Sequence, residues 1–166
     1  IPTYFYEFDS IGDARRDVTI DCYEIDKNSQ KILTGAAGMT DGKFRRSWTS
    51  ITGTSQNLAI DWPLLRFSDI LLMYAEADNE LNGAPSAAAQ SALQDVRLRA
   101  FRGHEDRMSA IPTDKDGFFN AIVQERLLEF GGEGIRKYDL IRWNLLGAKI
   151  DETRQKLSDF MNGVGR

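Results

Sequence analysis

Four acidic residues toward the C-terminal end of the chain have a spacing that could support chemistry. Glu125, Glu129 and Glu133 are four residues apart, so a helix would carry them on one face, and Asp139 follows shortly after. A glycosidase uses two carboxyl groups that face a sugar from opposite sides, one of them holding a proton at a raised pKa. These carboxylates are therefore candidates for hydrolysis of a glycosidic bond.

Arginines in the same stretch favour a different interpretation. Each carboxylate has an arginine within helical reach, and an adjacent guanidinium lowers a carboxyl pKa and removes its value as an acid. Arg126 with Glu129, and Asp139 with Arg142, are spaced to meet across one helix turn. We predict a structural ion-pair network at an interface between packed helices, formed by Glu125, Arg126, Glu129, Glu133, Arg136, Asp139 and Arg142.

Aromatic residues supply a second set of candidates, for sugar binding. A pyranose ring offers an apolar C–H face that stacks on aromatic side chains, while planar polar groups bond its hydroxyls. Tyr4 and Tyr6 alternate in a stretch with a strand-like pattern, and Trp48 borders a polar loop, so these three are the candidate ligand contacts, although core packing is the favoured interpretation for each. Trp62 and Trp143 are predicted to be core residues.

The remaining residue types give no further indication of chemistry. His104 is the single histidine, with no Ser or Cys nucleophile pattern around it, and the chain has neither a Gly-rich phosphate loop nor an HExxH motif. Cys22 is the single cysteine, which excludes an internal disulfide, and it lacks the neighbours of a zinc site. We predict that the protein is not an enzyme and uses no cofactor or metal.

Composition and charge narrow the class of protein. The 166 residues, 42% hydrophobic and 28% charged, suit one ordinary globular domain. A net charge of -4 with intermixed signs leaves no basic stripe for nucleic acid. No apolar run approaches the roughly 20 residues that span a bilayer. The opening residues enter a strand-like pattern directly, which we interpret as the start of a fragment.

Two regions are expected along the chain. Residues 1–61 favour strands and turns: a strand is predicted over 18–25, turns at 26–29 and 35–38, and a hairpin strand after Asp41-Gly42. From residue 62 to 166 the apolar period becomes helical. Thr113-Asp114-Lys115-Asp116 resembles a helix cap, and Gly131-Gly132 should end the helix over 118–130 that follows.

The helices have expected buried faces. The first, which starts at Pro63 and ends at Asn82-Gly83, should bury an apolar stripe, and the second, which starts at Pro85, should present small residues to it. A fourth helix is expected over 136–146, and a short amphipathic one after Lys149. The predicted buried residues are Leu64, Phe67, Leu71, Tyr74, Ala75 and Leu81 in the first helix, Ala87, Ala88, Ala89 and Ala92 in the second, and Tyr138, Ile141 and Leu145 in the fourth.

These elements predict a mainly α, α+β fold in which a small strand- and loop-rich region precedes tetratricopeptide-like helix pairs. Tyr74 and Ala75 would face the small-residue helix, although no clean 34-residue repeat returns. One helix pair cannot bury both of its faces. We therefore expect further helices, absent from this chain, to complete a larger fold.

Three ordered blocks resemble the SusD/RagB family of outer-membrane nutrient-binding lipoproteins. The chain has WPLLRFSDILLMYAEADNE at 62–80 where the family has LRYADVLLxYAEAxNE, and VRLRA at 96–100 like the family's NxVRxRAG. Its 125–143 block is similar to ERxxExxxEGxRxxDLxRW. Phe67, Gln94, Phe101 and Gly131-Gly132 depart from these patterns without disturbing them.

The resemblance implies a fragment of a larger SusD-like fold that captures glycans or other nutrients without catalysis. Such a protein delivers oligosaccharide or polysaccharide to a SusC-like TonB-dependent transporter. It would sit at the cell surface in the outer membrane, held only by an N-terminal lipid anchor absent from this chain, with no nucleic-acid partner.

Two alternatives stay open at this point. The helix pairs also fit a helical-repeat scaffold for protein partners, which the complete gene would show by lacking secretion and lipidation signals. The carboxylates keep open a glycoside hydrolase or lyase, which would release reducing sugar from polysaccharide.

Overall fold

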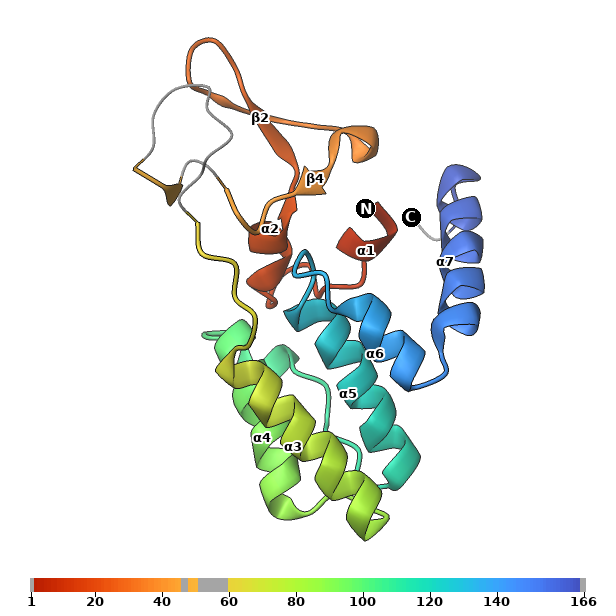
Figure 1. The fold of residues 1–166 in the computed structure, drawn as a ribbon. Coiled ribbons are helices and arrows are strands. Elements are labelled where there is room, and N and C mark those ends of the chain that lie inside the picture. Colours follow the sequence, from red (N-terminus) through yellow and green to blue (C-terminus); the bar gives the residue numbers. More distant parts are fainter. Residues whose placement is uncertain (1, 46–47, 51–59, 165–166) are drawn as a thin grey trace.

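The computed structural model describes residues 2–45, 48–50 and 60–164 (Figure 1). Within them are seven α-helices and four short strands, which confirms the mainly helical α+β class. The strands lie before residue 42 and the five longer helices begin at residue 67 or later. In Figure 1 the strand-bearing segment lies at one end of the molecule and α3 and α4 at the other, with α5 alongside α3.

The N-terminal region contains two separate antiparallel pairs of strands. Helices α1 (Pro2–Phe5) and α2 (Arg15–Thr19) lead into β1 (Ile20–Asp21), which pairs with β4 (Thr40–Asp41). Between these, β2 (Tyr23–Ile25) pairs with β3 (Lys31–Leu33), and η1 (Ala36–Gly38) precedes β4. The Asp26 carboxylate accepts the backbone N–H groups of Asn28 and Gln30, both at 2.8 Å, which confirms the predicted turn.

Two predicted strands are wrong, because contacts distant in sequence decide these segments. The opening residues form the helix α1, in which the Tyr4 hydroxyl donates to the carbonyl of Leu127 at 2.9 Å and the Tyr4 ring meets Phe8 edge-on at 5.0 Å. No strand follows Asp41 within 43–45. The chain instead turns at Lys43 and Phe44, directly after Gly42, whose N–H donates to the carbonyl of Thr19 at 2.8 Å, and residues 46–47 of the predicted strand lie outside the described residues.

Helices α3 (Phe67–Asn82) and α4 (Ala87–Ala100) form a hairpin, and α5 (Lys115–Glu129) packs against both. The predicted end of α3 is confirmed, since Gly83 adopts a left-handed φ of 72° there. The predicted cap of α5 is also confirmed: the Asp114 carboxylate accepts the N–H of Gly117 at 2.8 Å. The 3₁₀ turn η3 (Glu105–Arg107) lies in the connection and follows the exposed His104.

The apolar core lies where these three helices meet. Alanines at 89 and 92 are buried and let α4 approach its neighbours closely, whereas Ala87 and Ala88 are exposed, contrary to prediction. The large side chains of Leu72, Leu93, Phe118 and Ile122 are fully buried. The core consists of Leu72, Ala75, Ala89, Ala92, Leu93, Val96, Phe118, Ile122 and Phe130.

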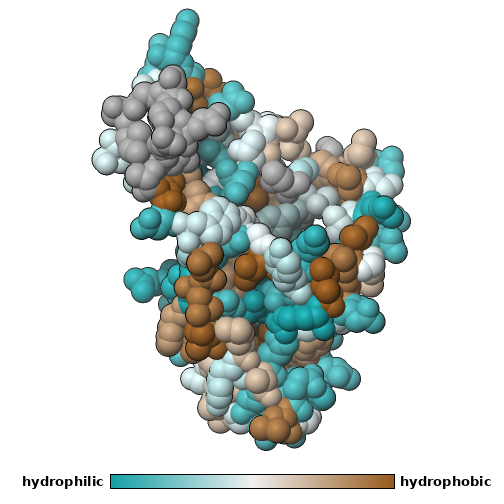
Figure 2. Space-filling view, viewed as in Figure 1, coloured by the Kyte–Doolittle hydropathy of each residue, from teal (hydrophilic) through white to brown (hydrophobic). Residues whose placement is uncertain are grey.

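The predicted buried stripe of α3 is largely wrong. Ala75 is buried and Leu71 partly so, but Leu64, Phe67 and Leu81 are 90%, 74% and 85% exposed, and Tyr74 is exposed too. The buried face instead carries Ser68, Leu72, Ala75 and Asn79. Both faces of α3 hold apolar residues, so periodicity alone could not choose between them. Figure 2 shows the resulting apolar patch over the start of α3.

The helix expected over 136–146 ends early, whereas the helix expected after Lys149 is present and begins sooner. Helix α6 (Arg136–Arg142) stops because Asn144 has a φ of 55°, and α7 (Leu146–Met161) then runs for 16 residues. Tyr138 and Ile141 are 67% and 51% exposed, so their predicted burial is wrong, and Leu145 is half-buried. The buried residues of α6 are Asp139 and Leu140 because ion pairs, and not an apolar stripe, orient this helix.

The two tryptophans predicted as core differ. Trp62 is 52% exposed, so its prediction is wrong, and its ring lies 4.7 Å from that of Phe44. Trp143 is half-buried, and its Nε1–H donates to Glu76 at 2.7 Å.

Among the described helices, none has both the length and the apolar character that crossing a membrane requires.

Candidate functional site

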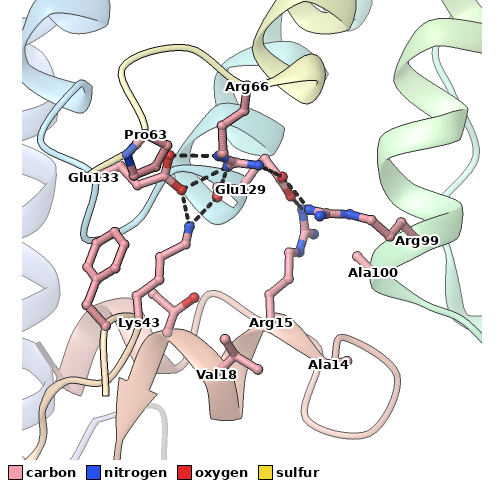
Figure 3. Close-up of a pocket in the computed structure, with 12 residues that line it drawn as sticks. Ala14, Arg15, Val18, Lys43, Pro63, Arg66, Arg99, Ala100, Glu129 and Glu133 are labelled. Atoms are coloured by element: carbon pink, nitrogen blue, oxygen red, sulfur yellow. Dashed lines mark hydrogen bonds and ion pairs between the residues drawn. The ribbon is translucent and has the colours of Figure 1, made fainter. Parts of the chain in front are cut away.

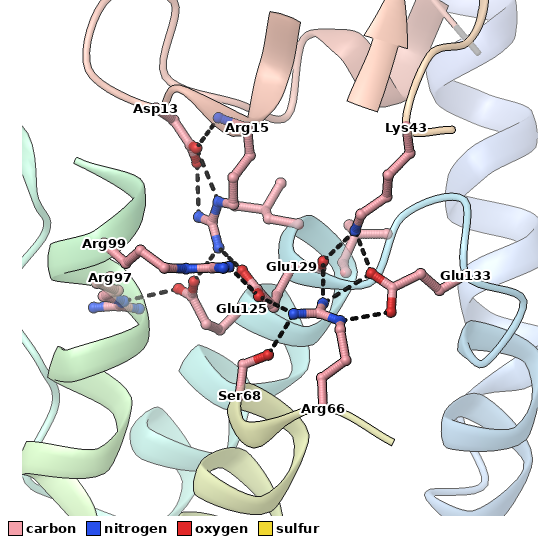
Figure 4. A network of polar contacts seen from close by, with 12 residues as sticks. Asp13, Arg15, Lys43, Arg66, Ser68, Arg97, Arg99, Glu125, Glu129 and Glu133 are labelled. Atoms are coloured by element: carbon pink, nitrogen blue, oxygen red, sulfur yellow. Dashed lines mark hydrogen bonds and ion pairs between the residues drawn. The ribbon is translucent and has the colours of Figure 1, made fainter. Parts of the chain in front are cut away.

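A cluster of buried ionic side chains lies between the N-terminal region and the helices (Figure 4). Glu125 and Glu129 lie one turn apart on α5 and Glu133 lies just beyond it; they are 3%, 1% and 6% exposed. Four separate segments bring cations to them: α2, the loop after β4, the start of α3, and α4. The cations are Arg15, Lys43, Arg66, Arg97 and Arg99.

Glu129 is the centre of this cluster. Its Oε1 accepts from Arg66 at 2.9 Å and from Arg99, and its Oε2 accepts from Arg15 at 3.2 Å. Burial by itself would raise the pKa of Glu129, but the hydrogen bond from Arg66 and the charges of Arg99 and Arg15 outweigh it and hold that pKa below its usual value. Such a carboxylate stays ionised and is poorly suited to donate a proton.

The flanking carboxylates share the same cations. Glu125 accepts from Arg15 at 2.5 Å and from Arg97 at 2.9 Å. Glu133 accepts a bidentate pair from Arg66, both bonds 2.8 Å long, and also pairs with Lys43. The three carboxylates thus bridge α4, α3 and the N-terminal region through one continuous set of charge-assisted bonds.

Arg15 fixes the N-terminal region to α5. Its guanidinium bonds Asp13 at 2.9 and 2.7 Å on one side and Glu125 and Glu129 on the other, and both Arg15 and Asp13 are buried. Burial disfavours its charge, but Asp13 and Glu125 more than compensate and raise the pKa of Arg15. At Lys43 the balance is reversed, since burial lowers the pKa of its ammonium despite the pairing with Glu133.

The other predicted ionic residues form a second cluster between α3, α5 and α6. Arg126 donates to Asp139 at 2.7 Å and to Asp69 at 2.6 Å, while Arg142 donates to Asp139 at 3.0 Å and also pairs with Glu76. Of the two helix-turn pairs considered in the sequence, Asp139 with Arg142 is present, whereas Arg126 turns away from Glu129.

Arg136 stands apart from both clusters. Its Nη1 donates to the carbonyl of Val123 at 2.9 Å, and its guanidinium lies 6.0 Å from the centroid of the Trp143 ring. Within the described residues, no carboxylate oxygen lies within ion-pair distance of it. Burial lowers the pKa of Arg136, with the charge of Asp139 opposing that shift.

Sequence reasoning missed the five cations of the first cluster. Arg66, Arg97 and Arg99 lie inside the sequence blocks quoted above, so those blocks held a signal for them. Arg15 and Lys43 come from a region 86 to 114 residues distant from Glu129, and nothing local in the sequence indicates their role.

A cavity of about 430 Å³ opens beside this first cluster (Figure 3). Its lining includes the charged side chains of Arg15, Lys43, Arg66 and Arg99 together with Glu129 and Glu133. Its other lining residues are Ala14, Val18, Thr19, Phe44, Pro63 and Ala100. The cavity combines charge with apolar surface, as small-molecule sites commonly do.

Of the predicted ligand contacts, Tyr6 lies at a second hollow. Its ring is 62% exposed and faces a space of about 530 Å³ between the start of the chain and α7. The Phe160 ring lies 5.8 Å from it, centroid to centroid, and Glu7 pairs with Lys156 at 2.5 Å. The lining also includes Thr3, Asp159 and Val164.

Tyr4 has different surroundings from Tyr6. Its half-buried hydroxyl donates to Leu127, and burial raises its pKa. A Cβ on Gly131 would overlap this hydroxyl, so a larger residue there would displace Tyr4. Trp48 is 57% exposed, with the Arg45 guanidinium 5.4 Å from its ring centroid. The strand face expected to align Tyr4 with Tyr6 does not exist.

Among the residues whose placement is described, no group of three or more His, Cys, Asp or Glu side chains could hold a metal ion. Cys22 is half-buried and free. Glu125, Glu129 and Glu133 have a spacing that could suggest a metal site or an acid–base pair. They are bonded to arginines instead.

Comparisons with known proteins agree with one another. A model of the SusD family matches residues 23–165. SusD-like protein P25 of Formosa agariphila is 45% identical over 83 residues, half of this chain and 15% of that protein. The crystal structure of a SusD homolog from Bacteroides thetaiotaomicron superposes with a TM-score of 0.74 at 30% identity, covering 87% of this chain and 32% of that one.

The chain therefore spans only a part of the length of both relatives. The family match nevertheless covers most of the chain, and the structural match covers 87% of it. This chain belongs to the SusD family.

Proposed function

We propose that the protein binds oligosaccharides or polysaccharides at the cell surface without cleaving them and delivers them to a SusC-like TonB-dependent transporter of the outer membrane. Family membership supports glycan binding in polysaccharide utilisation. The observation within this chain that carries the proposal is the exposed Tyr6 ring at a hollow that also offers paired polar groups.

The Tyr6 hollow has the chemistry that a sugar needs. The face of an exposed tyrosine can stack on the apolar side of a pyranose. Thr3, Asp159 and the Glu7–Lys156 pair lie around it and can exchange hydrogen bonds with ring hydroxyls. Its volume of about 530 Å³ lies within the range of roughly 300–1,000 Å³ typical of small-ligand sites.

Trp48 is the second proposed contact. Its ring is 57% exposed, and Arg45 lies against one part of it, so a planar polar group and an aromatic surface are adjacent. Tyr4 is a weaker candidate, since its hydroxyl is already bonded to α5. Its ligand role stays a prediction.

Binding without catalysis is favoured by the state of the carboxylates. An acid catalyst needs a raised pKa, but the arginines around Glu129 lower it, and Glu125 and Glu133 each accept from two cations. A glycoside hydrolase or lyase would need a different carboxylate pair. Reducing-sugar release from a polysaccharide by the purified protein would contradict this part of the proposal.

The transporter and the membrane location are inferred from the family. We expect the complete protein to carry an N-terminal lipid anchor, so that its only membrane contact is that anchor. Purification from detergent-solubilised outer membranes, followed by mass spectrometry, should recover a TonB-dependent barrel with it. Recovery with soluble partners alone would instead favour a scaffold.

A helical-repeat scaffold for protein partners is the second candidate. The observation that favours it is the apolar outer face of α3, where Phe67, Ile70, Met73 and Tyr74 are between 41% and 74% exposed. A patch of this kind commonly marks an interface. The match to the SusD family favours glycan binding, because a scaffold function would not explain that match.

The first test is glycan binding by two aromatic variants. Tyr6→Ala and Trp48→Ala should each weaken oligosaccharide binding at least about tenfold, because aromatic anchors contribute most at such sites, while leaving the thermal midpoint unchanged. Titration calorimetry with a panel of oligosaccharides measures this. Tyr138→Ala is the matched control, since that ring is 67% exposed but lies on α6.

The outcomes distinguish a failure of the two proposed contact residues from a failure of the proposed function. If the unchanged protein binds a glycan and both variants bind it equally well, Tyr6 and Trp48 are not in the site. If the unchanged protein binds no glycan of the panel, the proposed function itself fails.

A further inference from the structure

The cavity beside the first ionic cluster has more positive than negative charge. Its wall carries four cations, Arg15, Lys43, Arg66 and Arg99, but only the two carboxylates Glu129 and Glu133. Asp13, Glu125 and Arg97 complete the cluster outside the cavity lining, so five cations pair with four carboxylates and one positive charge is in excess. An excess of positive charge at a cavity attracts an anion.

Arg99 is the cation of this cluster with the fewest hydrogen-bond acceptors. Its side chain is 58% exposed, and only its Nη2 donates, to a Glu129 oxygen that Arg66 also uses. Among the described residues, its Nε and Nη1 have no acceptor. The guanidinium therefore keeps donors in a planar fork, the geometry that binds a carboxylate or sulfate with two parallel bonds.

Lys43 can add a further donor from the opposite side. Its Nζ bonds the carbonyl of Glu129 at 2.7 Å and pairs with Glu133, which uses two of its three protons. By contrast, every nitrogen of the Arg66 guanidinium already donates. Figure 3 shows Lys43 and Arg99 reaching toward Glu129 from different elements.

Apolar lining residues stand among the charged ones and can receive a sugar ring. Val18, Phe44 and Pro63 line the same cavity as Arg99 and Lys43, and its volume of about 430 Å³ has room for a ring with its substituent. An acidic sugar bound through its anionic group can place the apolar C–H face of its ring against these residues. A free inorganic anion would leave them unused.

We propose that this cavity binds the oxyanion of an acidic glycan, a carboxylate or a sulfate ester, with Arg99 and Lys43 donating to it. The inference rests on the proposed glycan-binding function and adds the class of glycan. It concerns a different cavity from the Tyr6 hollow, so an acidic chain could contact both places or only one.

The test compares three oligosaccharides of equal length by titration calorimetry: one with uronate carboxylates, one with sulfate esters and one neutral. The acidic chains should bind at least about tenfold more tightly than the neutral one, because hydrogen bonds to charged groups are the stronger ones. High salt should reduce this difference by screening. Whichever acidic chain binds more tightly identifies carboxylate or sulfate as the ligand group.

Arg99→Gln should lower the affinity for the acidic chain about tenfold and leave the neutral one unchanged. Arg154→Gln is the matched control, since it removes the same charge from a side chain that is 77% exposed on α7. Arg99→Lys, which keeps the charge but not the fork, should recover part of the affinity. Circular dichroism must first show that each variant is folded.

A failure of the acidic-ligand inference can be distinguished from a failure of glycan binding. Equal binding of acidic and neutral chains, or an acidic affinity that Arg99→Gln leaves unchanged, would overturn the acidic-ligand inference while glycan binding stands. If no chain binds, methyl galacturonide and methyl galactoside test the cavity alone. Equal or absent binding of these two would overturn the inference as well.

Discussion

Two parts of the molecule are held together by different physical means. Helices α3, α4 and α5 meet through a core of apolar side chains, of which Leu72, Leu93 and Phe118 are fully buried. The N-terminal region joins α5 largely through buried ions, with Arg15 and Lys43 inserted among glutamates. Its strands are two or three residues long, and β3 is wholly exposed.

The difference shows what each kind of contact can do. Apolar packing tolerates many arrangements, whereas a bidentate arginine pair accepts few, so the ions set how the N-terminal region sits on the helices. Buried ions also cost desolvation energy, and removing one partner leaves an uncompensated charge. The apolar core should therefore resist acid, whereas the ionic interface should not.

The largest expected effect comes from the apolar side of this comparison. Phe118→Ala removes a fully buried ring and should lower the free energy of unfolding by roughly 3–5 kcal/mol through lost transfer energy and a cavity. Urea denaturation measures this. Phe67→Ala, at a ring that is 74% exposed, should stay within about 0.5 kcal/mol. A loss below about 1 kcal/mol for Phe118→Ala would contradict the described core.

A smaller effect is expected where the two parts touch without ions. Gly131→Ala places a Cβ against the Tyr4 hydroxyl and should lower the free energy of unfolding by roughly 1–3 kcal/mol, because α1 must move. Gly147→Ala is the control: it lies in α7 with open space around it and should be neutral or slightly stabilising. Equal midpoints in thermal unfolding for both variants would mean that Tyr4 does not pack on Gly131.

The sequence predicted the helical region better than the N-terminal one. The C-terminal end of α3 and the cap of α5 depend on local residues such as Gly83 and Asp114, and these predictions are confirmed. Helix α1 and the pairing of β1 with β4 depend on partners elsewhere in the chain, such as Leu127 for Tyr4. Local patterns contain no information on such partners, so the segment predicted as a strand at the start of the chain is a helix instead.

The ionic cluster shows the same limit. The spacing of Glu125 and Glu129 correctly indicates one face of a helix, whereas Glu133 lies beyond the end of α5, and the sequence indicates neighbouring arginines as partners. The arginines that reach Glu129 come from α2, α4 and the start of α3, because only tertiary folding brings them near. The apolar face of α3 was misassigned for the opposite reason, since two faces fit the pattern equally well.

The most direct test of the ionic interface is hydrogen exchange as the pH is lowered, corrected for the intrinsic rate. Because the pKa of Glu129 is lower in the folded state than the usual 4.5, its ion pairs stabilise the fold above that value and are lost as the pH falls through the lowered one. Below pH 4.5, amides of residues 15–41 should lose protection before those of α3 to α5. Simultaneous loss in both parts, or earlier loss in the helices, would contradict the account.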